Sequence, residues 1–162
     1  MKRSISALWL TAILALSASG ALAGEAKGTL VHPKATVTLK YAYLVKGPDA
    51  IDNKKIIRRI ILSGTDLSAK LQACAAMSCS DSDLTEGMTV DLDGGPRLNY
   101  WMVLNGGMIQ HSGSKEAAVL KVSADDAKHL AGKLSFDDSA MGGPKVDVDF
   151  DANFVKAFTK AR

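Results

Sequence analysis

Long apolar runs are scarce in this chain, and it lacks any specific motif for catalysis or metal binding. It has no Gly-x-Ser-x-Gly turn, no close His pair or Cys–His pair, and no complete EF-hand loop for calcium. The 162 residues, 47% of them hydrophobic, fit one globular domain and are too apolar for disorder. The missing motifs favour a protein that is not an enzyme and has no cofactor.

The main apolar stretch, at the start of the chain, is typical of a secretory signal. Two basic residues precede apolar residues over 5–16, and Ala21-Leu22-Ala23 matches the small-x-small cleavage pattern. About 12 residues are too few for the roughly 20 of a membrane-spanning helix. We therefore expect a cleavable signal at 1–23 and a single β-sandwich domain at 24–162. The protein would act in the periplasm or outside the cell, without an integral membrane segment.

Charge is unevenly spread over the expected mature domain. Residues 24–75 hold nine basic and four acidic side chains, whereas residues 76–162 hold nine basic and 13 acidic ones. The sum is nearly neutral, which argues against nucleic-acid binding because a basic surface supplies most of that affinity. We predict that the two halves pair internally; a field that steers a partner is the alternative.

Both cysteines, Cys74 and Cys79, lie in one short stretch. In an oxidising compartment such a pair most often forms a local disulfide. Redox-active pairs usually have two intervening residues, and here there are four. We therefore expect a structural disulfide, with a redox or metal-binding role and free thiols as the alternatives.

Short β-type runs separated by turn residues dominate the domain. They are bounded by Gly, Pro, Asp or Ser and cover residues 28–32, 35–45, 88–92, 98–104, 107–112, 117–122, 132–136 and 145–150. About eight strands predict a mainly β fold, an antiparallel β-sandwich of immunoglobulin-like or barrel-like form.

One or two short helices are expected beside the strands. Asp66, or the threonine before it, can cap a helix over 67–76. Ser123 and Asp126 have the spacing of a capping box, which predicts a second helix over 124–131. Both helices would bridge strands.

The segment Lys54–Leu62 fits two structures. Its isoleucines recur at helical spacing opposite Lys and Arg, as in a basic amphipathic helix on an anionic membrane. Its β-branched residues and the Ser63-Gly64 stop favour a strand, which we predict. Alternation would then put Lys55 and Arg59 on one face and Arg58 on the other. Charge scattered in this way is typical of a protected edge strand.

The clearest hairpin signal is Asn105-Gly106 between alternating apolar residues. A two-residue loop there would pair Tyr100 with His111 and put both on one face, with Trp101 on the other. Both faces carry large apolar groups. Either the hairpin is buried on both sides, or one face is a binding surface.

Metal signals are weak. Met102, Met108 and His111 could suit copper, but the expected pairing separates the two methionines. Aspartates could supply oxygen ligands for weak calcium binding, the alternative to a solvated acidic face, at Asp81, Asp83, Asp91 and Asp93. We predict no metal site.

We expect a small exported, non-catalytic binding or interaction module for an unidentified exported protein or glycan. The binding candidates are aromatic and basic side chains, the types found at interfaces: Tyr100, Trp101, His111, Lys55, Arg58, Arg59 and Lys115. One alternative is a small periplasmic hydrolase that joins His111, Ser112 and either Asp91 or Asp93. Another is an inhibitor of an exported wall hydrolase that uses a Ser112–Lys115 loop as its wedge.

Overall fold

The computed structural model describes residues 23–162, so the expected signal at 1–23 lies outside the described residues except for its last residue. Nine strands are present: β1 (Gly24–His32), β2 (Ala35–Pro48), β3 (Ile56–Ser63), β4 (Gly87–Leu92), β5 (Arg97–Leu104), β6 (Ile109–Glu116), β7 (Leu120–Asp126), β8 (His129–Asp137) and β9 (Lys145–Ala157). Two short helices are α1 (Ser68–Ala73) and α2 (Cys79–Ser82). The predicted mainly β fold is confirmed.

All nine strands belong to one sheet, in the order β6-β5-β4-β3-β2-β1-β9-β8-β7. Neighbouring strands are antiparallel, and a short parallel pairing also joins β2 to β9. The last strand of the chain thus lies between β1 and β8. The sheet is not closed, because within residues 23–162 strand β6 pairs only with β5, and β7 only with β8.

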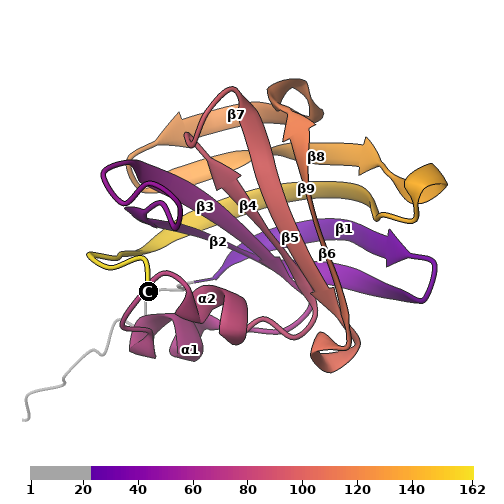
Figure 1. Cartoon of the computed structure of the whole chain (residues 1–162), viewed down its shortest axis with the longest axis horizontal. Helices are drawn as coiled ribbons and strands as arrows, with labels where there is room; N and C mark the ends of the chain where they lie inside the picture. Colours follow the sequence, from indigo (N-terminus) through magenta and orange to yellow (C-terminus); the bar gives the residue numbers. More distant parts are fainter. Residues whose placement is uncertain (1–22) are drawn as a thin grey trace, which may run out of the picture.

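The two edge strands are consecutive in the chain. β6 and β7 are joined only by the three-residue turn η2 (Ala117–Val119). Nine strands in a flat sheet would be roughly 38 Å wide, whereas four peptide steps reach about 14 Å. The sheet must therefore curve strongly, and in Figure 1 strands β5 and β6 cross over β8 and β9.

The face of the sheet turned toward this curve, here called the inner face, carries the larger apolar core. Its buried side chains come from most of the strands and include Leu30, Leu39, Ile60, Val90, Tyr100, Leu134 and Val148. The rings of Tyr100 on β5 and Phe136 on β8 lie 5.0 Å apart between centroids. Strands distant in the sheet order are thus packed against each other.

The two helices cover the opposite, outer face of β2 and β3. Their buried side chains pack on Tyr43 and Ile61, and Figure 1 shows both helices below the sheet. The Tyr43 hydroxyl donates to Oδ1 of Asp66 at 2.9 Å and accepts from the Leu67 N–H at 2.7 Å. Asp66 also accepts from the Ser68 N–H at 2.8 Å, which fixes the start of α1 near the predicted cap. None of the described helices is long and apolar enough to cross a membrane.

The predicted helix over 124–131 is wrong. Those residues form the end of β7, a turn and the start of β8. The Asp126 side chain does bind a backbone N–H, but in the hairpin turn and not at a helix start: its Oδ1 accepts from the Lys128 N–H at 2.8 Å. The physical reason is long-range: Leu130 is fully buried and pairs with Ala152 of β9, and no local signal contains this contact.

Most of the ambiguous segment Lys54–Leu62 forms strand β3, as predicted, but Lys54 and Lys55 lie in the turn before it. Its predicted place at an edge is wrong, because β3 lies between β2 and β4. A strand with two consecutive arginines can be central here since carboxylates from other elements neutralise both.

The hairpin between β5 and β6 has a longer loop than predicted. Leu104 pairs with Ile109 and Met102 pairs with His111, so four residues make the turn. Positive φ angles at Asn105 (52°), Gly106 (64°) and Gly107 (97°) allow this longer turn. The predicted pairing of His111 is therefore wrong by two residues. A shift of two keeps every side chain on its predicted face.

Candidate functional site

The candidate residues do not form one site, because the two faces of β5 and β6 divide them. Tyr100, His111 and Lys115 belong to the inner side, whereas Trp101 is on the outer face. Each group therefore has to be judged by its own contacts.

On the inner side, Tyr100 and Lys115 meet a residue that the sequence did not suggest, Asp138. The Tyr100 hydroxyl donates to Oδ2 of Asp138 at 3.0 Å, and Lys115 forms an ion pair with Oδ1. Asp138 is 6% exposed. The Tyr100 ring also packs against Phe136 and stacks on His111 at 6.1 Å. Burial, and then the neighbouring Asp138 carboxylate, raises the pKa of Tyr100.

This inner cluster is closed by a glycine. A Cβ added at Gly113 would lie 2.8 Å from the hydroxyl oxygen of Tyr100 and 2.9 and 3.0 Å from two of its ring carbons. The ring thus occupies the space that a side chain on β6 would need. The cluster ties β5 and β6 to Asp138, in the segment after β8.

The residues of the hydrolase alternative are not brought together. His111 pairs with Met102 on the inner side, whereas Ser112 pairs with Trp101 on the outer face. Adjacent residues of a strand point to opposite faces, so the imidazole cannot reach the hydroxyl. The expected loop at Ser112–Lys115 is also wrong, since these residues lie within strand β6.

The two arginines of β3 are both engaged by carboxylates. Arg58 binds Asp93 through Nε at 2.7 Å and Asp125 through Nη1 at 2.6 Å. The bond to Asp93 is the main cause that raises the pKa of Arg58. Lys55 is exposed and donates to the Gly94 carbonyl at 3.4 Å. The pairs of Arg58 join basic and acidic halves of the chain, as the charge distribution predicted.

Arg59 is the more deeply buried arginine, at 7% exposed. Asp91 holds it with two bonds, to Nε at 2.5 Å and to Nη2 at 3.0 Å, and Asp81 binds Nη1 at 2.9 Å. Burial alone would lower the pKa of Arg59, but these two carboxylates raise it. Burial raises the pKa of Asp81, and Arg59 opposes that shift.

The four aspartates considered for calcium are divided among different partners. Asp81 and Asp91 bind Arg59, and Asp93 binds Arg58. Asp83 lies against the disulfide instead. The structure therefore does not bring the four carboxylates to one point.

The outer face of β3, β4 and β5, beside α2, contains a depression of about 320 Å³. It is lined by Arg59, Asp81, Thr89, Asp91, Asn99, Tyr100 and Trp101. The pairing register explains this composition, because Thr89 lies opposite Trp101 and Asp91 lies opposite Asn99. The Asn99 Oδ1 accepts from the Ser114 hydroxyl at 2.6 Å. An aromatic side chain is thus surrounded by carboxylate, amide and hydroxyl groups.

Trp101 and Arg59 are candidates that the sequence identified, whereas Thr89 and Asn99 were missed. Trp101 is partly exposed beside exposed Asn99 and Ser112. Alternation in β4 and β5 is the signal that could have found the missed residues, since they share the outer face with Trp101. The pairing of these residues, however, depends on the hairpin between β4 and β5, whose loop contains a positive φ angle at Asp93 (66°).

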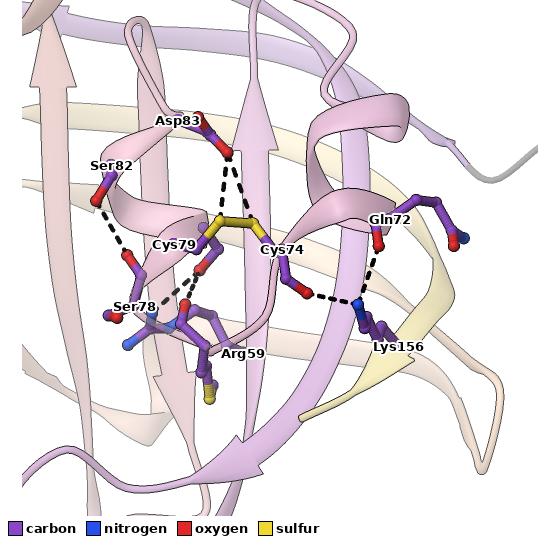
Figure 2. The surroundings of a disulfide bond; sticks show 10 residues. Arg59, Gln72, Cys74, Ser78, Cys79, Ser82, Asp83 and Lys156 are labelled. Atoms are coloured by element: carbon purple, nitrogen blue, oxygen red, sulfur yellow. Dashed lines mark hydrogen bonds between the residues drawn. A yellow bond between two sulfur atoms is a disulfide. The ribbon is translucent and has the colours of Figure 1, made fainter. Parts of the chain in front are cut away.

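The predicted disulfide between Cys74 and Cys79 is present, with Cα atoms 5.7 Å apart. Figure 2 shows it between α1 and α2, with the carboxylate of Asp83 directed at both sulfur atoms. Lys156 of β9 donates to the Cys74 carbonyl at 2.5 Å and to the Gln72 carbonyl at 2.9 Å. The bond therefore sits in a loop that β9 also holds.

Comparisons with protein-family models, with curated proteins and with solved structures return no match.

Proposed function

We propose that the protein is an exported, non-catalytic binding module that takes a neutral glycan in the depression on the outer face of β3, β4 and β5. The observation that carries this proposal is the partly exposed ring of Trp101 within the polar depression. The face of an aromatic ring suits the C–H groups of a sugar, and the surrounding polar groups suit its hydroxyls.

Charge favours a neutral ligand over an anionic one. Among the described residues, Arg59 is the one cation that lines the depression, and it is already bound by two carboxylates, Asp81 and Asp91. An incoming phosphate or carboxylate would meet those carboxylates without a free cation to bind it. Sugar hydroxyls can donate to the carboxylates and to Asn99, which makes a neutral glycan the better match.

The rest of the proposal concerns shape and place. We propose a barrel-like form for the curved sheet, supported by the short connection between β6 and β7 and by the Lys115–Asp138 pair. Such a form would hold the outer face rigid. Export is supported by the disulfide, which persists in oxidising compartments, and by the signal-like start of the chain.

Fluorescence of Trp101 tests the proposal. In a Trp9→Phe background, Trp101 is the only tryptophan of the full chain. The probe is a neutral tetramer of N-acetylglucosamine; we expect a saturable blue shift of the emission and protection from iodide quenching. By calorimetry, Trp101→Ala should weaken binding at least about fivefold, because an aromatic contact contributes roughly 1 kcal/mol beyond its buried area. Val122→Ala, an exposed change on β7, is the matched control.

Two results would overturn the glycan assignment. Binding of tetralysine but not of the sugar, with loss at high salt, would assign the depression to basic peptides through its carboxylates. No saturable change with either probe would remove the depression as a binding site.

A further inference from the structure

The surroundings of the disulfide contain a contact that a disulfide does not explain. Oδ2 of Asp83 lies 3.6 Å from Sγ of Cys74 and 3.5 Å from Sγ of Cys79 (Figure 2). A bonded sulfur carries no hydrogen, so the carboxylate gains no hydrogen bond from either atom. Two sulfurs and one carboxylate oxygen facing a common point are, however, a set of metal ligands.

We propose that reduction of the disulfide creates a metal site in which Cys74, Cys79 and Asp83 bind one thiophilic divalent cation such as Zn²⁺ or Cd²⁺. Tetrahedral zinc has bonds of about 2.3 Å to sulfur and 2.0 Å to oxygen, which place the two ligand atoms about 3.5 Å apart. Both sulfur–oxygen distances in the protein already have this value within 0.1 Å. Only the two sulfurs have to separate, by rotation of their side chains.

Local backbone structure determines the relative positions of two of the three ligands, Cys79 and Asp83. Cys79 begins α2 and Asp83 directly follows it, four residues later, so the two side chains lie on one side of a helical turn. The Asp83 N–H donates to the Cys79 carbonyl at 3.1 Å, which continues that turn.

Bonds other than the disulfide hold the third ligand and the loop. Lys156 binds the Cys74 carbonyl at 2.5 Å. The N–H groups of Met77 and Ser78 donate to the carbonyls of Lys160 and Ala161 at 3.0 and 2.9 Å. Because these bonds come from the C-terminal segment, they remain when the sulfur–sulfur bond is cut. The ligands are therefore positioned in the reduced protein as well.

The chemistry balances with a phosphine as the reductant. The phosphine and one water convert the disulfide into two thiols and a phosphine oxide. The cation then displaces the two thiol protons and binds the two thiolates and the Asp83 carboxylate. Cys79 and Asp83 are partly exposed, so the ion can enter and water can take the fourth position.

The test uses the full chain with Cd²⁺ as the probe, read by sulfur-to-cadmium absorption and by native mass spectrometry. We expect one Cd²⁺ per reduced chain and none per oxidised chain. Asp83→Asn should weaken binding at least tenfold in the reduced protein, and Cys79→Ser should abolish the absorption. Glu86→Gln, which removes another carboxylate close in sequence, is the matched control and should bind as the parent does.

Three results would overturn the site. Equal binding by the oxidised chain would place the ion elsewhere, and unchanged affinity in Asp83→Asn would reduce the site to a simple dithiol. If circular dichroism shows that reduction unfolds the chain, Cd²⁺ must restore the fold, because a site built from these ligands stabilises it; failure to do so also overturns the proposal. Sugar binding at Trp101 is measured separately, so the two proposals can fail independently.

Discussion

Two neighbouring residues of β5, Tyr100 and Trp101, lie in opposite kinds of environment. Tyr100 is 5% exposed, with its hydroxyl bound to Asp138 and its ring packed against Phe136. Trp101 is partly exposed in a depression lined with polar groups. The side chains are similar in size and chemistry, and strand alternation alone separates them.

The difference shows how polar groups are used on each side. On the inner side, a lysine and a tyrosine both bind the carboxylate of one buried aspartate. On the outer side, Asn99 and Ser112 are exposed next to the indole ring. The inner side should therefore control stability and the outer side should control binding.

The strongest test of this comparison replaces each aromatic residue in turn. Tyr100→Ala should lower the free energy of unfolding by about 3 to 5 kcal/mol, since it empties a buried space. Trp101→Ala should cost only about 1 kcal/mol, because the ring is partly exposed. Urea unfolding measures both, and equal losses would show that Trp101 belongs to the core.

The next largest effect concerns the buried ion pair. Asp138→Asn leaves the Lys115 ammonium without its counterion and should cost about 2 to 3 kcal/mol, below the full value for a buried pair because Lys115 retains some exposure. The matched control is Glu116→Gln, which breaks the exposed pair with Arg97 and should cost less than about 0.5 kcal/mol. Similar losses in the two variants would contradict the closed inner cluster.

A smaller loss is expected at Gly113. The methyl group of Gly113→Ala would collide with the Tyr100 ring, and the shift needed should cost about 1 to 2 kcal/mol. Gly95→Ala serves as the control, since a Cβ there meets nothing within 4 Å. A neutral Gly113→Ala variant would mean that the ring can move away from β6.

The smallest effect is expected in the pH dependence of the unfolding free energy. In the unfolded chain, Tyr100 ionises near its ordinary pKa of 10.0. In the folded protein, burial and then Asp138 raise the pKa of Tyr100. Stability from this group is complete below pH 10 and is lost as the pH rises toward the folded pKa. Tyr100→Phe should therefore flatten the fall of unfolding free energy above pH 10. Part of the fall should remain, because burial also raises the pKa of Tyr43 to about 12.

Trp101→Phe is the control for that measurement, since it introduces no change in ionisation. Its curve should run parallel to that of the parent chain. If Tyr100→Phe also runs parallel, ionisation of Tyr100 does not contribute to alkaline destabilisation.

Alternation along single strands is what the sequence predicted well. The faces of Tyr100, Trp101, Arg58 and Arg59 follow from local period-two spacing. For Tyr100 and Trp101 the predicted faces are correct even though the predicted hairpin register is wrong by two residues. The disulfide was also predictable, since its two cysteines are neighbours in sequence.

Contacts between distant segments were not predictable. Asp138 lies 38 residues from Tyr100 and 23 from Lys115, with no pattern that links them. The capping box at Ser123 and Asp126 suggested a helix because pairing with a neighbouring strand is invisible in the local sequence. The contact of Asp83 with both sulfur atoms of the disulfide depends in the same way on the three-dimensional structure.

The central position of β9 has a consequence for biosynthesis. β9 joins β1 to β8, so a chain that ends before Lys145 would contain two separate sheets, one of six strands and one of two. β1, the first strand of the chain, can pair with β9 only after this last strand has been synthesised. The pairing has a high contact order, which slows folding. A nascent chain therefore completes its sheet only after residues 145–157 of β9 have been synthesised.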